Sequence, residues 1–308
     1  MDADLSRNGS PPVAGIGRHI PDRSSMPELP EVETVRRMSA PHVVGRTIDR
    51  VELGDFPGVI ETTLPGVPAS WLTGRRIEAA NRRGKFLLFP LDDGNTMVVH
   101  LRMTGRLLVM PPDAPTVRFE LLRMALSSGE QLRFADQRKF GRVSIFTPED
   151  VERLESRLGP EPLSSALTAH HLHAALQRRT GSIKGALLDQ RLIAGLGNIY
   201  VDEALWETRI HPLTRANALA LGDLDALLVA IRAILTAAIA NQGTSFSTFE
   251  NPYGEAGSNA RNLKVYGRAK NAGACERCGT PLERIVVAGR GTTFCPNCQV
   301  LQARAEAE

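Results

Sequence analysis

The chain has 308 residues, and its 37 Lys and Arg against 34 Asp and Glu give a formal net charge of +3. With 42% apolar and 23% charged residues, the composition excludes a largely disordered protein, and the length favours at least two domains. The most apolar stretch, residues 219–240, contains two aspartates and an arginine, which excludes a membrane-spanning helix there, and we expect no membrane partner.

The basic side chains are concentrated in two segments. Residues 75–142 contain 13 basic and 7 acidic side chains, and residues 261–298 contain 7 basic and 2 acidic ones. Such segments suit a polyanion such as nucleic acid, although basic side chains also simply solvate surface strands. Charge alone leaves both interpretations open.

The first half of the chain changes from a polar leader to strands. Residues 1–26 are rich in Gly, Pro, Ser, Asp and Arg without periodicity, which is typical of a disordered leader. A short helix is predicted over 31–40, ending near Pro41. Alternating apolar and polar residues separated by turn signals then predict an antiparallel β-sandwich or barrel. The predicted strands are 47–53, 85–91, 97–109, 118–126, 131–134 and 142–146.

The pattern changes at residues 158–162, Leu-Gly-Pro-Glu-Pro, where we place a domain boundary. Beyond it the apolar spacing is helical, and a polar, glycine-rich loop over 243–262 precedes the cysteine segment. The predicted helices are 163–178, 185–191, 198–208 and 216–241. The fold class expected is therefore α+β, multidomain, with strands first and helices second.

All four cysteines lie in one short segment near the end of the chain. Cys275 and Cys278 form one Cys-x-x-Cys pair, Cys295 and Cys298 form another, and 16 residues separate the pairs. Two such pairs supply the four thiolates of a structural Zn²⁺ site. Two disulfides or free thiols are the alternative. The clustering fits a reduced, cytoplasmic protein better than a disulfide scaffold.

The residues between the two cysteine pairs predict a β-hairpin. Strands over 282–287 and 292–294 would flank Gly289-Arg290-Gly291. The segment is thus expected to be a zinc-finger β-hairpin that holds one Zn²⁺ and presents Arg290 near its tip.

The sharpest signal is at residues 26–34, Met-Pro-Glu-Leu-Pro-Glu-Val-Glu-Thr. Taken alone, its prolines and glutamates are explained as an acidic helix start. Read with the rest of the chain, it resembles the start of the formamidopyrimidine-DNA glycosylase family, which includes enzymes for oxidised purines and related endonuclease VIII enzymes for oxidised pyrimidines. The resemblance covers nearly all of residues 26–299, and its matching segments are 83–85, 100–105, 136–141, 158–163, 195–200, 265–268 and the zinc segment.

The resemblance implies a bifunctional DNA glycosylase/AP lyase that excises oxidised purines, such as 8-oxoguanine and formamidopyrimidines, from damaged double-stranded DNA. In the family, a terminal proline amine, here Pro27, attacks C1′ of the damaged nucleotide, and the resulting Schiff base permits β- and δ-elimination. Glu28 is implied as the acid/base group beside it. Lys85 is implied as a strand lysine that contacts phosphate, and Glu31 as a support for the terminus.

Three further residues match the side chains that fill the gap left by a flipped nucleotide. Met103 would be an apolar plug, Arg138 a guanidinium facing the orphaned cytosine, and Phe140 an aromatic wedge. Taken singly, Met103 on an alternating strand is explained as core and Phe140 as a turn aromatic. Their joint occurrence, with Pro-Glu-Leu-Pro at the start, favours the oxidised-purine branch.

Phosphate contacts are expected at a helix start and in the basic segments. Residues 195–198, Gly-Leu-Gly-Asn, precede a predicted helix whose free N–H groups suit a phosphate, and the piece resembles the family's helix–two-turn–helix. An N-cap role for Asn198 is compatible with this, and His100 alone is equally explained as a strand histidine. The candidates for phosphate contacts are His100, Lys184, Asn198, Tyr266 and Arg290.

The resemblance also divides the chain, which we expect to act as a monomer. The parts are a leader at 1–26, an N-terminal catalytic β-sandwich domain with a terminal helix at 27–158, a helix–two-turn–helix DNA-binding domain at 159–262 with a lesion loop at 243–262, a zinc finger at 263–300, and a tail at 301–308.

Two features depart from the family pattern. With residues 1–26 attached, the nitrogen of Pro27 is a tertiary amide that cannot form an iminium, so we expect translation to begin at Met26 or the leader to be removed. Gly257 is followed by Ser-Asn-Ala-Arg rather than an aromatic residue. Two alternatives therefore stay open: an oxidised-pyrimidine glycosylase of the same fold, and a non-catalytic DNA-damage binder if the leader is retained.

Overall fold

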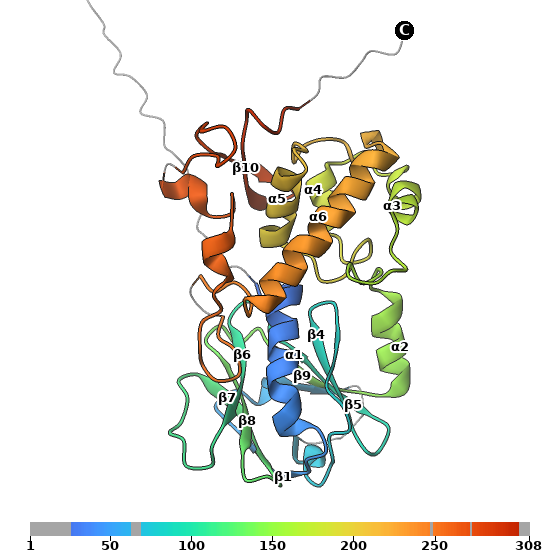
Figure 1. The fold of residues 1–308 in the computed structure, drawn as a ribbon. Helices are drawn as coiled ribbons and strands as arrows, with labels where there is room; N and C mark the ends of the chain where they lie inside the picture. Colours follow the sequence, from blue (N-terminus) through green and yellow to red (C-terminus); the bar gives the residue numbers. More distant parts are fainter. Residues whose placement is uncertain (1–25, 63–68, 247–248, 272, 302–308) are drawn as a thin grey trace, which may run out of the picture.

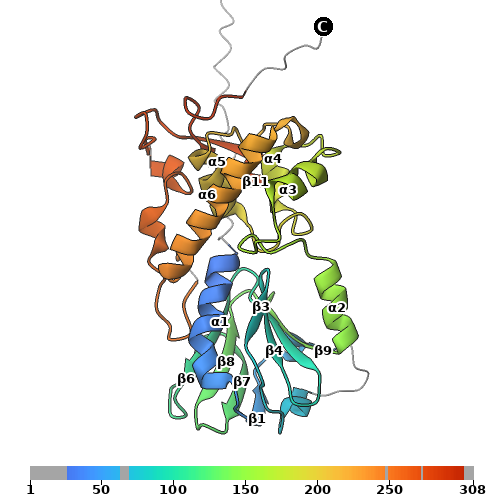
Figure 2. The same ribbon diagram turned by 45° about the vertical axis from the view of Figure 1, so that its right-hand side comes forward.

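The computed structural model describes residues 26–62, 69–246, 249–271 and 273–301; the predicted leader up to residue 25 and the tail beyond residue 301 lie outside these ranges. A strand-rich lobe and a helical lobe lie end to end, joined at the start of helix α1 and along the segment that carries α2 (Figures 1 and 2). The expected order of strands before helices is confirmed.

The strand-rich lobe consists of two sheets that pack face to face. One sheet has the order β1-β7-β8-β6, and the other has the order β2-β9-β5-β4-β3. All pairings are antiparallel except that of β2 with β9. The strands are β1 (Ile48–Leu53), β2 (Ile60–Thr62), β3 (Asn81–Arg83), β4 (Phe86–Pro90), β5 (Thr96–His100), β6 (Gly105–Met110), β7 (Glu120–Leu126), β8 (Gln131–Asp136) and β9 (Arg142–Phe146).

The core of this lobe lies between the sheets. Phe89 and Val99 from one sheet and Leu122 and Phe134 from the other are fully or almost fully buried in one cluster. In β7, buried positions alternate with half-buried ones from Leu122 to Leu126, so one face of this strand packs on the core. The predicted antiparallel sandwich is confirmed, although β2 and β3 were not predicted.

The single strand predicted over 97–109 is wrong. The chain leaves the five-stranded sheet after β5, turns through residues 101–104 and enters the other sheet as β6. The amide of Gly105 donates to the carbonyl of Leu101 (2.9 Å), and the amide of Arg102 donates to Nδ1 of His100 (3.0 Å). Because the apolar alternation continues on both sides of the turn, the sequence pattern did not reveal the break.

Helix α1 (Leu29–Val43) belongs to both lobes. Val32 and Val35 are buried in the sandwich core, whereas Leu29 is buried in the core of the helical lobe. The helix continues through Pro41, so the predicted end was about one turn too early. Its first residues therefore lie at the junction of the two lobes, where they meet α6 (Figure 2).

The helical lobe is built around α6, which packs against α1, α3 and α5. Its core contains Tyr200, Leu205, Leu227 and Ile231. The helices predicted over 185–191 and 198–208 are confirmed within a few residues, whereas those over 163–178 and 216–241 are shorter than predicted, and α2 was not predicted. The helices are α2 (Pro148–Ser156), α3 (Ala169–Leu176), α4 (Ile183–Leu188), α5 (Asn198–Glu207) and α6 (Leu221–Ala240).

A two-stranded hairpin, β10 (Glu283–Val287) with β11 (Arg290–Phe294), packs on α5. Its turn is Ala288-Gly289, and both residues have positive φ (49° and 71°), as a two-residue hairpin turn of this twist requires. The turn lies one residue earlier than predicted, so Arg290 is the first residue of β11. Among the described helices, none is long and apolar enough to cross a membrane.

Candidate functional site

The start of α1 places Pro27 and Glu28 at the junction of the lobes. Pro27 is buried, and the amide of Leu29 donates to the carbonyl of Gly195 (3.0 Å). The carboxylate of Glu28 accepts from the amides of Ile199 (2.9 Å) and, at 3.5 Å, Tyr200. These amides are in the first turn of α5, whose positive end favours an anion.

Close packing at this helix end explains one glycine of the Gly-Leu-Gly-Asn segment. A Cβ atom on Gly197 would lie 2.3 Å from Cδ of Glu28, which no side chain tolerates. Because Gly197 has no side chain, the Glu28 carboxylate can approach the first turn of α5.

Burial and neighbouring charges shift the pKa of Glu28 towards neutral pH. The pKa of its carboxyl is raised to about 7, mainly by burial and also by the charge of Glu31, against the opposing effects of Lys85 and the two amides. In turn, burial lowers the pKa of Lys85, and Arg290 lowers it too, whereas Glu28 and Glu31 raise it. These mutual electrostatic effects place Glu28, Lys85 and Arg290 at one site, although Glu28 and Arg290 are 262 positions apart in the sequence.

Glu31 ties this site to two other segments. Its carboxylate accepts from the Tyr200 hydroxyl (2.5 Å), the Thr244 amide (2.7 Å) and the Glu28 amide (2.8 Å). Burial raises the pKa of Glu31, and these hydrogen bonds lower it. Tyr200 and Thr244 were missed by sequence reasoning, although Tyr200 belongs to a segment that was singled out. Glu31 thus fixes the start of α1 against α5 and the root of the glycine-rich loop.

Lys85 is not on a strand, contrary to expectation. It lies with Gly84 in the turn between β3 and β4, directly before Phe86. Glu161, from the linker between the lobes, accepts from the Gly84 amide (2.7 Å) and pairs with Arg82 (2.7 Å) and Arg83 (3.2 Å). The linker carboxylate therefore anchors the turn that carries Lys85. Glu161 was also missed, although it lies within the segment that marked the domain boundary.

Met103, Arg138 and Phe140 lie together on two neighbouring turns. Met103 is in the turn between β5 and β6, not on a strand, and the other two are in the turn between β8 and β9. The guanidinium of Arg138 lies 4.7 Å from the ring centre of Phe140, and its Nη1 lies 3.1 Å from the sulfur of Met103. Phe140 is 49% exposed, so its ring is accessible at the surface beside Arg138.

Three of the phosphate candidates, Arg290, Asn198 and His100, lie around the same region. Arg290 is exposed at the start of β11, and Asn198 donates from Nδ2 to the Gly291 carbonyl beside it (2.9 Å). His100 is buried edge-on to Phe86, and burial with the charge of Arg102 lowers its pKa to about 3. Because its Nδ1 accepts the Arg102 amide, the neutral ring carries its hydrogen on Nε2.

The backbone at Tyr266 is held by the buried carboxylate of Glu203 on α5. Glu203 accepts from the amides of Lys264 (2.7 Å), Val265 (2.9 Å) and Tyr266 (2.8 Å). The Tyr266 ring packs at 5.5 Å from the ring of Phe246, which belongs to the predicted lesion loop. Glu203 had not been singled out, because a buried carboxylate inside a helix leaves no sequence signal.

The structure does not present Lys184 for a phosphate contact, and this prediction is wrong. The side chains of Lys184 and Asp202 are both 0% exposed, and they form an ion pair at 2.5 Å. Lys184 also donates to the Gly291 carbonyl (3.3 Å), and Asp202 accepts from the Thr293 amide (3.0 Å). The pair therefore fastens hairpin β10–β11 to α4 and α5 instead of facing solvent.

The four cysteines converge at the base of that hairpin. All four sulfur atoms lie within 4.8 Å of one another, with Cys278 and Cys295 at 3.5 Å and Cys275 and Cys298 at 3.9 Å. These separations exclude disulfides and fit tetrahedral thiolate ligands of one structural Zn²⁺. Trp206 Nε1 donates to the sulfur of Cys275 (3.3 Å), so the metal site is coupled to α5.

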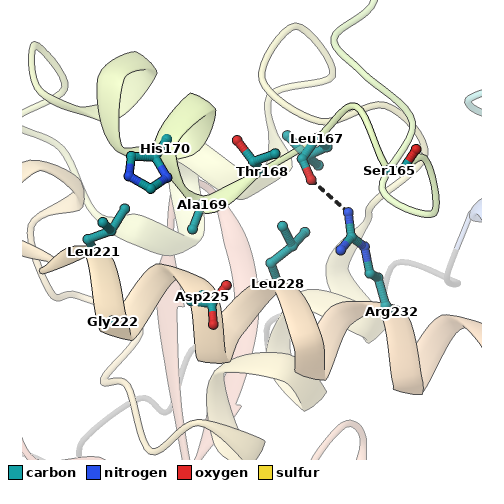
Figure 3. A pocket seen from close by; sticks show the side chains of 10 residues that line it. All are labelled: Ser165, Leu167, Thr168, Ala169, His170, Leu221, Gly222, Asp225, Leu228 and Arg232. Atoms are coloured by element: carbon teal, nitrogen blue, oxygen red, sulfur yellow. Dashed lines mark hydrogen bonds between the residues drawn. The ribbon is translucent and has the colours of Figure 1, made fainter.

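A separate cavity of about 420 Å³ lies between α3 and α6 (Figure 3). Arg232, one of its polar lining residues, already forms hydrogen bonds within the protein. Its guanidinium donates to the carbonyls of Pro162, Ser164 and Leu167. None of the predicted site residues lines it.

Comparison with known proteins agrees with this arrangement. Residues 26–143 match the family model of the formamidopyrimidine-DNA glycosylase N-terminal domain, residues 158–250 that of its H2TH domain, and residues 274–300 that of a zinc finger found in FPG and IleRS. The formamidopyrimidine-DNA glycosylase of Herpetosiphon aurantiacus is 45% identical over 89% of this chain and 100% of its own length. That of Chloroflexus aggregans is 49% identical over 90% of this chain and 99% of its own length.

Solved structures show the same similarity in three dimensions. A Lactococcus lactis FPG mutant bound to DNA containing Fapy-dG has 39% identity and a TM-score of 0.81, with 89% of this chain and 100% of that one covered. A MutM complex with DNA containing carbocyclic 8-oxo-G has the same identity, coverage and TM-score. The fold, the zinc-binding cysteines and these relatives together show that this chain belongs to the formamidopyrimidine-DNA glycosylase family of DNA repair enzymes.

Proposed function

We propose that this glycosylase excises oxidised purines from duplex DNA with the nitrogen of Pro27 as nucleophile, and that it then cleaves the strand as an AP lyase. The observation that carries the proposal is the position of Pro27 beside Glu28, at the positive end of α5 and within the charge field of Lys85. The family members in complex with Fapy-dG and 8-oxo-G DNA support the substrate class.

The reaction begins at the sugar carbon that bears the damaged base. The lone pair of the Pro27 nitrogen forms a bond to C1′, the glycosidic bond breaks, and the base leaves with the bonding pair and takes up a proton. Sugar-ring opening then gives an iminium, whose positive nitrogen draws electrons from the neighbouring C2′–H bond and makes elimination of the 3′ and then the 5′ phosphate possible. Hydrolysis of the last iminium releases the enzyme.

Glu28 is suited to move protons in these steps. With a pKa of about 7, its carboxyl is close to half protonated near neutral pH, so it donates to the sugar ring oxygen and accepts again without a large energetic cost. The bound amides of α5 hold the carboxylate in place through the cycle.

Positive side chains around the site support binding of the DNA backbone. Arg290, which is exposed, is the main donor proposed for phosphate oxygens, with Lys85 and His100, which are 7% and 9% exposed, as further donors at the same site. Such contacts position a duplex without reading its sequence. The proposal takes the enzyme to act as a monomer, because every residue that it uses comes from one chain. It places the enzyme in the cytoplasm, where cysteine thiols stay reduced and can bind zinc.

The test is trapping of the covalent intermediate. Protein produced from Met26 loses that methionine and presents Pro27 as a secondary amine. We expect borohydride to trap it on DNA that contains an abasic site or 8-oxoguanine opposite cytosine. Intact protein that begins at Met1, verified by mass spectrometry, should bind the same DNA but form no adduct, because an acylated nitrogen has no available lone pair.

Two outcomes would contradict parts of the proposal. Equal trapping of the intact Met1 form would identify another amine as nucleophile, with Lys85 the first to examine. Faster excision of thymine glycol than of 8-oxoguanine would assign the enzyme to oxidised pyrimidines; a Lactococcus lactis family member has been solved with DNA that contains an oxidised pyrimidine.

A further inference from the structure

The two turns that carry the gap-filling side chains meet at a buried carboxylate. Asp136 is 1% exposed and is the last residue of β8. Its Oδ1 accepts from the Arg138 amide (3.0 Å), and its Oδ2 accepts from the amides of Phe140 (2.8 Å) and Gly141 (2.6 Å). One side chain thus closes the turn that presents Arg138 and Phe140.

Thr104 connects this turn to the one that carries Met103. Its hydroxyl donates to Oδ1 of Asp136 and also accepts from the amide of Arg138 (3.2 Å). Thr104 is the residue directly after Met103, and it is buried. A single threonine and a single aspartate therefore determine how Met103 lies relative to Arg138 and Phe140.

Each of the two turns contains a residue in an unfavourable backbone conformation. Arg102 and Lys139 have positive φ values of 54° and 57°, a region that non-glycine residues avoid. The second turn is also tightly packed, because a Cβ on Gly141 would lie 2.5 Å from the Phe134 ring and 3.1 Å from the Asp136 carboxylate. Conformations of this kind persist only where surrounding contacts over-determine them.

We propose that Asp136 and Thr104 are positioning residues that assemble Met103, Arg138 and Phe140 into a preformed wedge before DNA binds. The wedge thereby fixes the donors of Arg138 relative to the base opposite the lesion and determines the discrimination between cytosine and adenine there. The inference rests on the proposed function, since it assigns the geometry on which opposite-base selection depends. A preformed wedge also avoids the entropic cost of ordering two turns on binding.

The test compares two substitutions of Thr104 with one of Asp136. Thr104→Val removes the hydroxyl and keeps the shape, whereas Thr104→Ser keeps the hydroxyl. Asp136→Asn replaces one acceptor oxygen by a donor that faces an amide. For each protein we would measure single-turnover excision of 8-oxoguanine opposite cytosine and opposite adenine, cleavage of an abasic site, and thermal stability.

We expect Thr104→Val and Asp136→Asn to lower the ratio of excision opposite cytosine to excision opposite adenine by roughly tenfold, the effect of losing one hydrogen bond to a charged group. Abasic-site cleavage should fall clearly less than this ratio does, and Thr104→Ser should retain the ratio. If Asp136→Asn fails to fold, the two Thr104 variants decide the question.

Several outcomes separate this inference from the proposed function. An unchanged ratio in folded Thr104→Val overturns the inference, and so does an equal loss of all activities, which indicates a merely structural role. If the wild-type protein excises 8-oxoguanine opposite neither base, the proposed substrate is wrong, and the wild-type measurement shows this independently of the variants.

Discussion

The protein holds two arginines toward the region of the proposed DNA site by different means. Arg290 is on hairpin β10–β11, and the four cysteines of the zinc site flank this hairpin. Arg138 is on the β8–β9 turn, where its amide donates to the Asp136 carboxylate. The hairpin has only a small cluster of buried residues around Trp206 and Val265, whereas the turn rises from the large sandwich core. A short segment without its own core needs a metal, whereas a turn on a well-packed sheet needs only hydrogen bonds.

The largest effect expected from this difference is on the metal-bound hairpin. Replacing Cys295 with Ser should lower the Zn²⁺ content of the protein well below one per chain and weaken binding to abasic-site DNA by roughly 100-fold, because structural zinc supplies much of the folding free energy of such a segment. Metal analysis and a binding titration check this. The sandwich, including the Arg138 turn, should remain folded, and loss of both regions together would contradict the comparison.

An intermediate effect is expected from the buried pair that fastens the hairpin to the helices. Asp202→Asn leaves Lys184 charged without its partner at a 0% exposed position and should reduce the free energy of unfolding by about 3–5 kcal/mol. Thermal or denaturant unfolding measures this. Zinc content should stay near one per chain, because the cysteines are untouched, and a loss of zinc would show that the metal site depends on this anchor.

The smallest effects distinguish what the two arginines do. Arg290→Ala should weaken binding to damaged and undamaged duplexes alike and reduce the slope of log affinity against log salt by about 1, as for a phosphate contact. Arg138→Ala should instead lower the preference for cytosine opposite the lesion by roughly tenfold, with little effect on abasic-site cleavage. Equal loss on both substrates for Arg138→Ala would argue against its base-reading role.

Sequence patterns predicted the layers of the fold and the metal, but not how the turns are built. Cysteine spacing and strand alternation are local, so they are readable along the chain. The break between β5 and β6 was missed because the alternation continues through both, and Lys184 was misassigned because nothing in its neighbours along the chain shows that Asp202 buries it. Glu161 and Glu203 bind backbone amides of distant segments, and Tyr200 donates its hydroxyl to Glu31 on another helix. Such partners are visible only in three dimensions.

The ion pairs of Glu161 in the segment between the lobes affect how DNA affinity should depend on salt concentration. Its pairs with Arg82 and Arg83 are shielded, since the three side chains are only 22%, 11% and 15% exposed. Mobile ions screen such pairs far less than they screen charges in open solvent. The junction between the lobes should therefore stay intact over a range of ionic strength in which affinity for DNA falls steeply, and the measured salt dependence should report counterion release from the duplex, with little contribution from movement of one lobe against the other.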